Sequence, residues 1–111
     1  MDKITLSDFQ KLDIRIGTVK KAEVPEWSHW VMKLTVDLGS EIGERTIFAG
    51  LMKDYKIKEI KGKQFPFLIN IEPKKIGPEG DFSQGMMLAA GDERPYVFKL
   101  DEKVPAGTRV R

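Results

Sequence analysis

Two stretches of this chain combine side chains that suit contact with a nucleic acid. Residues 25–30 and residues 72–83 carry aromatic, cationic and hydroxyl groups, namely Trp27, His29, Trp30, Lys74, Lys75 and Ser83. Lysines neutralise phosphates, and flat aromatic rings offer surfaces on which unpaired bases stack. Large aromatic side chains in a loop can instead pack against the end of a fold, so the sequence leaves both roles open for each tryptophan.

The same sequence offers little for catalysis. It has no phosphate-binding glycine loop, no nucleophile elbow and no dinucleotide-binding glycine set. Asp13 and Asp37 lie on separate predicted strands, where carboxylates are usually solvated or paired with cations. There is no cysteine, and a zinc site around His29, the single histidine, would need three carboxylates. We therefore expect a protein that is not an enzyme and uses no metal or cofactor.

The distribution of charge favours a phosphate-binding surface more than the net charge does. The formal net charge of this 111-residue chain is only +2. Between Lys53 and Lys75, however, seven lysines stand against three acidic residues, which leaves +4 in this segment and −2 elsewhere. A local basic surface on a nearly neutral protein suits specific phosphate contact. A solvated lysine surface on a stable protein has the same composition and is the structural alternative.

The length and the apolar content set the class of protein. A chain of 111 residues fits one domain with a modest core. No run approaches the roughly 20 apolar residues of a membrane span, and Met1 to Thr5 lack the apolar segment of a signal peptide. We expect a single-domain cytoplasmic protein that does not contact a membrane.

Alternating apolar residues predict five strands. Their ranges are 12–24 with a bend or bulge at Gly17, 32–38, 44–49, 65–71 and 86–90. By the same alternation, Lys33, Thr35 and Arg45 lie on one outward face of the second and third strands. Met86 and Met87 lie on opposite sides of the fifth strand, so one fills the core and the other is free for contact.

The remaining segments predict helices and loops between these strands. A short helix is expected over residues 54–60, with Ile57 and Ile60 on its buried side. A single helical turn over residues 8–10 is expected to be capped by Thr5 or Ser7. Proline cannot donate to a ladder, so the fourth strand should have an edge or a bulge at its proline, Pro66.

The order of these elements predicts an all-β fold. Three strands, one short helix and two more strands are the order of an OB-fold, a five-stranded barrel; a β-sandwich is the alternative. Such a barrel binds oligonucleotides on strands two and three, between two flanking loops, here residues 25–30 and 72–83. The barrel occupies about residues 10–91 of a single domain and leaves residues 92–111 as a C-terminal extension.

One motif and three earlier stretches resemble a known family. The run from Ser83 to Ala90 reads SQGMMLAA, and it follows, in a matching order, Asp8-Phe9 with Lys11 to Gly17, Lys33 to Gly39, and Tyr55 to Lys63. Together they resemble the tRNA-binding domain family. That family includes free-standing tRNA-binding proteins, the beta subunit or C-terminal domain of methionyl-tRNA synthetases, and a related secretion chaperone.

The resemblance implies a non-catalytic homodimer that binds tRNA mainly by its shape. Dimerisation would use the extension, residues 92–111. The resemblance also implies a synthetase as a possible partner, for which this chain would act in trans as the beta subunit. The family motif implies tRNA contact through Ser83 and Met86. Together with the aromatic and cationic residues of the two loops and of the outward strand face, the predicted RNA-binding residues are Trp27, Trp30, Lys33, Arg45, Lys74, Lys75, Ser83 and Met86.

The first loop departs from the family pattern. The family usually has His-Pro-Asn-Ala-Asp-Lys where this chain has Pro25 to Trp30, so the asparagine and lysine of that loop are missing. Pro25-Glu26 instead resembles a turn of the chaperone branch. The alternative function is a chaperone-like dimer that binds extended polypeptides near Trp27 and Trp30; a third is an interaction subunit that docks on a synthetase. Because Trp27 lies nearer the loop tip, we expect it to be the stacking platform.

Overall fold

The strongest alternation in the sequence forms a central strand of the structure. The computed structural model describes all of residues 1–111, and its strand β2 (Met32–Asp37) buries Met32, Leu34 and Val36. The residues between them stay partly exposed. This alternation fixes the register, because a slip by one residue would turn every buried side chain of the strand to solvent.

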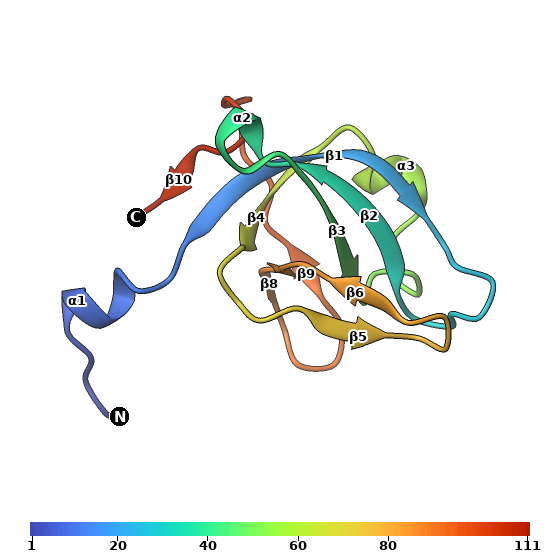
Figure 1. Cartoon of the computed structure of the whole chain (residues 1–111), viewed down its shortest axis with the longest axis horizontal. Helices are drawn as coiled ribbons and strands as arrows, with labels where there is room; N and C mark the ends of the chain where they lie inside the picture. The colour runs from blue at the N-terminus through green and yellow to red at the C-terminus, as the bar shows by residue number, and fades with distance from the viewer.

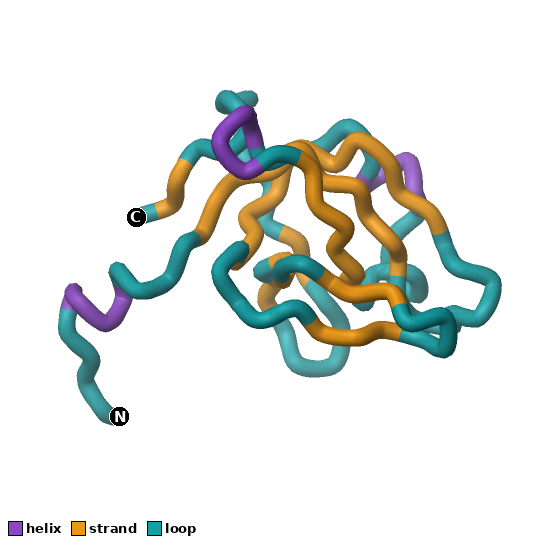
Figure 2. The backbone as a smooth tube through the Cα atoms, in the orientation of Figure 1, coloured by secondary structure: helices purple, strands orange, loops and turns teal.

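Five antiparallel strands wrap around one apolar core (Figures 1 and 2). Their order in the sheet is β3 (Glu44–Ala49), β2, β1 (Ile14–Glu23), β4 (Gln64–Leu68) and β7 (Met86–Met87). The short helix α3 (Ile57–Ile60) lies between β3 and β4 along the chain. This arrangement confirms the predicted OB-fold.

Strand β1 is long enough to pair with two barrel neighbours. Residues 14–18 pair with β4, and residues 18–23 pair with β2. The register shift falls between Val19 and Lys21, so the sequence prediction of a bulge at Gly17 is wrong in position. The sharing of β1 between two strands is what allows the sheet to close into a barrel.

Gly17 is required for a different reason, the close approach of side chains inside the barrel. A Cβ atom at this position would overlap Val36 Cγ1 and would lie 2.9 Å from Leu38 Cδ2. Any larger residue would therefore force the core apart, and overpacking of this kind destabilises a fold. The glycine marks a crowded point in the core, and the bulge follows it.

Two strands end earlier than the alternation predicts. Leu12 and Ile71 lie outside β1 and β4 and are 41% and 43% exposed. Pro66 lies within β4, where its carbonyl accepts a hydrogen bond from Leu88 N–H at 3.0 Å. Pro66 has no N–H and cannot donate a second hydrogen bond to the neighbouring strand. The pairing of β4 with β7 therefore stops at Met87. The predicted ladder edge beside this proline is confirmed.

Two single helical turns flank the barrel strands. Helix α1 (Leu6–Phe9) is capped by Thr5, whose Oγ1 accepts from Asp8 N–H at 3.1 Å. The pKa of Asp8 is lowered because its carboxylate accepts the Thr5 backbone N–H and contacts Lys11. Helix α2 (Gly39–Ile42) connects β2 to β3. Of the two predicted caps, Thr5 and Ser7, Thr5 is the one that caps α1, and the helical turn begins two residues before the predicted range 8–10.

Helix α3 is shorter than its prediction. It covers only the second half of residues 54–60. Ile60 is fully buried but Ile57 is 39% exposed, so the predicted shared buried side is wrong for Ile57. None of the three helices has the length and apolar composition needed to span a bilayer.

The residues predicted as a long loop, 72–83, form a β-hairpin. Strand β5 (Lys74–Ile76) pairs with β6 (Asp81–Ser83). The turn between them places Gly77 and Gly80 at φ +75° and +79°, a region that glycine enters without strain. Three-residue strands leave no periodic signal, which is why the sequence does not reveal them. The hairpin lies across the front of the barrel beside β3 (Figure 1).

The predicted fifth strand divides into two short pieces. Strand β7 stays in the barrel, whereas β8 (Ala89–Ala90) pairs with β9 (Tyr96–Val97) in a separate two-stranded sheet. Met87 is 8% exposed in the core, and Met86 is 44% exposed. The two methionines thus have the opposite environments that the alternation predicts.

The residues after Gly91 are held against the barrel by hydrogen bonds. Strand β10 (Arg109–Val110) pairs with the start of β1, and Ile16 N–H donates to Thr108 O at 2.8 Å. The Gln64 side chain donates to Val104 O at 2.7 Å and accepts from Val104 N–H at 3.0 Å. The C-terminal segment is therefore held by backbone pairing as well as by side chains.

Candidate nucleic-acid interface

The barrel closes between β3 and the residues around Ser83, and we call this junction (residues 46–48 with 83–85) the seam. Ser83 is 7% exposed. Its Oγ accepts from Phe48 N–H at 3.0 Å and donates to Gly85 O at 2.9 Å. Both hydrogen-bonding functions of this hydroxyl are thus engaged within the protein.

Gln84 makes the next part of the seam. Its backbone N–H donates to Thr46 O at 2.8 Å, and its side-chain Oε1 accepts from Thr46 N–H at 2.9 Å. Gly85 follows without a side chain, because a Cβ there would lie 2.9 Å from Ile47 Cδ1. Two side chains therefore take the place of the continuous backbone ladder that joins the other strands.

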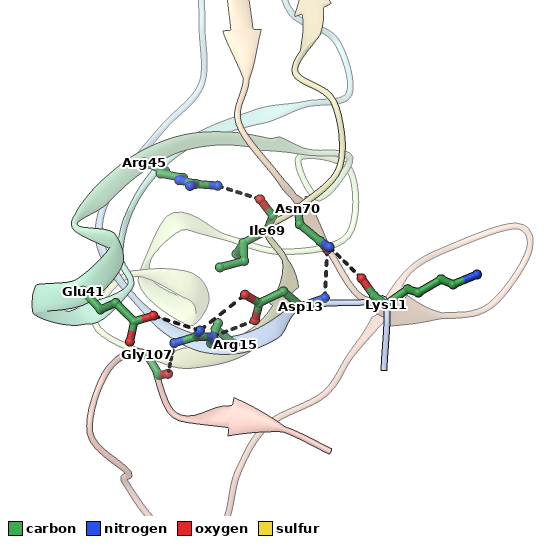
Figure 3. Close-up of polar contacts among 8 residues, drawn as sticks. All are labelled: Lys11, Asp13, Arg15, Glu41, Arg45, Ile69, Asn70 and Gly107. Carbon is green, nitrogen blue, oxygen red and sulfur yellow. Dashed lines mark hydrogen bonds and ion pairs between the residues drawn. The ribbon is translucent and has the colours of Figure 1, made fainter. Parts of the chain in front are cut away.

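Arg45 does not lie on the outward face that the sequence predicts. It stands opposite Val36, which is fully buried, so it shares the inward side of β3. Its Nη1 donates to Ile69 O at 2.7 Å (Figure 3) and to Gln84 O at 3.3 Å. Arg45 thus closes one end of the barrel, away from Lys33.

A second polar group lies near Arg45 at this end of the barrel (Figure 3). Arg15 Nε contacts Asp13 Oδ1 at 2.7 Å, and the Asp13 carboxylate raises the pKa of Arg15. Arg15 also reaches Glu41 at 3.3 Å and donates to Gly107 O. Asp37 Oδ1 accepts from Gly39 N–H at 2.9 Å. Asp13 and Asp37 therefore both have partners within the fold.

The two tryptophans have different environments, in the reverse of the expected assignment. Trp27 is half-buried, its ring centroid lies 6.2 Å from that of Phe48, and its ring occupies the space where a Cβ at Gly77 would be. Trp30 is 53% exposed. The turn between them is fixed by Ser28, whose Oγ accepts from the N–H of Val31 at 2.9 Å. Trp30 is thus the more exposed of the two rings.

The cationic side chains do not share one environment. Lys33 Nζ lies 3.6 Å from Asp81 Oδ2. Lys33 and Trp27 also line a small pocket that contains four acidic residues, Glu23, Glu26, Glu79 and Asp81. Like charges would repel a phosphate there. Lys74 and Lys75 are exposed on β5 without an ion-pair partner, so their charges are not neutralised within the fold.

Phe82 is a candidate that the sequence reasoning missed. It pairs with Lys75 across the hairpin and is 53% exposed. Residues opposite each other in an antiparallel pair share a face, so a cation and an aromatic ring lie side by side on the hairpin. Recognition of the hairpin would have been needed to find this pair. Met86 is the exposed apolar side chain next to the seam.

Comparisons with known sequences identify similar domains. The family model described as "Putative tRNA binding domain" matches residues 14–109 of this chain. A methionine–tRNA ligase of Archaeoglobus fulgidus is 44% identical over 110 residues, which cover 98% of this chain and 16% of that protein. A methionine–tRNA ligase of Clostridium tetani is 35% identical over 113 residues, which cover 99% of this chain and 17% of that protein. The chain thus spans about one sixth of the length of these relatives.

Two kinds of solved structure have the same fold over their whole length. A MetRS related protein from Pyrococcus horikoshii superposes with a TM-score of 0.90 and 37% identity, covering 100% of both chains. The chaperone CsaA from Bacillus anthracis superposes with a TM-score of 0.88 and 27% identity, covering 99% of this chain and 100% of that one. Barrel, hairpin and terminal segments are therefore shared with both.

Proposed function

The chain belongs to the tRNA-binding domain family, and from this premise we propose that it binds tRNA without catalysing a reaction. The observation that carries the proposal is the hairpin at residues 74–83, which presents Lys74, Lys75 and Phe82 to solvent beside the seam. Lysines neutralise backbone phosphates, and exposed rings stack with unpaired bases. Both contacts follow the shape of a folded RNA more than its sequence.

The predicted binding residues divide into two groups under this proposal. Trp30, Lys74, Lys75 and Met86 are exposed and contact the RNA directly, together with Phe82. The others support them: Trp27 packs under the hairpin turn, Lys33 pairs with Asp81, Arg45 closes the barrel end and Ser83 holds the seam. Loss of a supporting residue would weaken binding through the geometry of its neighbours.

Replacing Lys74 and Lys75 with alanine is expected to weaken tRNA binding and flatten its salt dependence. Each lost phosphate contact lowers the slope of log affinity against log salt by about 0.7–0.9. The double variant should therefore lose about 1.4–1.8 from this slope. Titration of labelled tRNA at several salt concentrations measures it.

The matched control removes two exposed lysines on and beside α3, Lys58 and Lys61. It has the same net charge as the first variant but leaves the hairpin intact. An equal loss of slope in both variants would show that only total charge matters. A slope lost in the control alone would place the phosphate contacts at α3.

We further propose that the protein is a homodimer. The arm that contains α1 extends away from the barrel (Figure 1), and its Ile4 and Leu6 are 70% and 71% exposed. A pocket lies between this arm and β10, lined by Phe9, Leu12 and Val110 among others. A second copy would cover these apolar side chains, and two linked sites raise the effective affinity for one folded RNA. The dimer interface would then combine the arm with the C-terminal segment.

The mass of the protein tests the dimer. Light scattering at micromolar concentration should give twice the chain mass of 12.6 kDa. Replacing Leu6 with glutamate should shift the mass toward one chain, because it places a charge within the proposed interface. A mass of one chain for the unaltered protein would contradict the proposal.

Similarity to two kinds of protein supports a partner for this chain and a second candidate function. The similarity to methionine–tRNA ligases supports action in trans as a beta subunit of such an enzyme, in the cytoplasm where tRNA is used. The similarity to chaperone CsaA supports a second candidate, binding of extended polypeptides near Trp30. A titration with an unfolded polypeptide beside the tRNA titration separates the two functions, since only the favoured ligand should bind in the micromolar range.

A further inference from the structure

A pocket lies beside the seam, where β3 ends and β7 passes into β8. Its cavity volume is about 330 Å³, at the lower end of the range for small-molecule sites. The walls come from the end of β3, from β7 and β8, and from the turn at residues 91–95. This size suits one planar group and excludes a duplex.

The lining of the pocket leaves room for a flat ring. Gly50, Ala89 and Ala90 line it, and all three are exposed. Met86 lines it as well, with 44% of its surface exposed and a flexible, polarisable side chain that adapts to a ring. A Cβ built at Gly50 would lie 3.8 Å from Trp30 Cδ1, so the exposed indole stands at the edge of the pocket.

The charges around the pocket exclude a phosphate. Asp92 and Glu93 line it. The cation in the lining, Arg94, already has two partners. Its Cζ lies 4.6 Å from the ring centroid of Tyr96, and its Nε lies 4.0 Å from Asp54 Oδ1. A phosphate would meet two carboxylates and one cation that already has partners, whereas a nucleobase carries no charge and can donate hydrogen bonds to carboxylates.

We propose that this pocket holds one unstacked base of the bound RNA. The inference rests on the proposed function and extends it: the hairpin lysines contact phosphates, while the pocket takes a base beside Met86 and Trp30. Because the base is neutral, its contribution to binding is independent of salt. This property separates the pocket from the phosphate contacts in an experiment.

The first test adds a nucleoside and a sugar phosphate separately to the protein. The protein carries five methionines, and their methyl resonances can be followed by NMR with labelled methionine. Adenosine at millimolar concentration should shift the methyl resonance of Met86 and leave that of Met32, which is 1% exposed in the core and does not line the pocket. Ribose 5-phosphate should shift neither. A shift with ribose 5-phosphate but not with adenosine, or with an unfolded polypeptide but not with adenosine, would overturn the proposal.

The second test fills the pocket in the full chain. Ala90→Leu should lower the affinity for tRNA about tenfold, the loss expected for one stacked base, with the slope of the salt dependence unchanged. Ser40→Leu adds the same side chain at an exposed position on α2 and should bind as the unaltered protein does. Circular dichroism should show that both variants melt as the unaltered protein does.

The outcomes separate this inference from the proposed function. If Ala90→Leu binds tRNA with unaltered affinity, the pocket proposal fails and the role of Lys74 and Lys75 stands. If Ala90→Leu flattens the salt dependence, the pocket contacts phosphate and the proposal fails. If the unaltered protein does not bind tRNA at all, the proposed function fails, and the adenosine titration still decides whether the pocket takes a base.

Discussion

A chain shortened to end at Gly91 is expected to lose cooperative folding. The removed segment supplies β10 to the edge of β1 and accepts the Ile16 N–H through Thr108 O. Its removal also leaves the Gln64 amide without either of its bonds to Val104. Each lost hydrogen bond costs about 0.5–1.5 kcal/mol, so the loss of these three bonds together with the β10 pairing removes a large part of the total stability of a small domain, about 5–15 kcal/mol.

Thermal unfolding followed by circular dichroism measures this outcome. The unaltered protein should show one cooperative transition, and the shortened chain should show none at 25 °C. Removal of Arg111 alone is the control, since that residue lies outside β10. A shortened chain that melts as the full chain does, but has half its mass, would show that residues 92–111 serve only dimerisation.

Substitution of the two tryptophans is expected to give opposite results. Trp30→Ala should lower the affinity for tRNA by about 1–3 kcal/mol and leave thermal stability unchanged, because its ring is 53% exposed. Trp27→Ala should instead lower stability by about 2 kcal/mol, less than the 3–5 kcal/mol of a fully buried ring. Its ring packs against Phe48 and the turn at Gly77, so a cavity would remain between the first loop and the hairpin.

Fluorescence and melting measurements on the same samples check this pair. In Trp27→Phe only Trp30 emits, and tRNA should quench that emission; in Trp30→Phe the remaining emission should change little. Equal quenching in both variants would mean that both rings contact RNA. Quenching by an unfolded polypeptide and not by tRNA would favour the chaperone-like function.

The parts of the fold set by alternation and turn chemistry could be predicted from the sequence. Strand β2 and strand β3 lie where expected, the helix after β3 falls within its predicted range, and Met86 and Met87 have the opposed environments expected. Each depends on contacts that repeat every two residues or on a local cap, as at Thr5. Such signals survive in a single sequence because they need no knowledge of distant segments.

The placement of Arg45 shows what alternation cannot supply. Ile47 and Phe48 are both buried although they lie on opposite sides of β3, because Trp27 packs against Phe48 on the outer side. Because two adjacent residues of β3 are buried, the apolar pattern does not reveal which side of the strand faces the core. Alternation therefore predicts Arg45 on the wrong face. The hairpin at residues 74–83 and the tether of the C-terminal segment depend equally on contacts between distant residues.

The seam has a consequence for how the protein fluctuates. Ser83 and Gln84 replace the ladder there with side-chain bonds and one backbone bond, from Gln84 N–H to Thr46 O. Joints with few backbone bonds open locally at a free energy below that of global unfolding. A ligand that touches both Met86 and the end of β3 spans this joint and binds only when it is closed. Part of the binding free energy of such a ligand would therefore suppress that opening, and binding would slow local exchange at the seam.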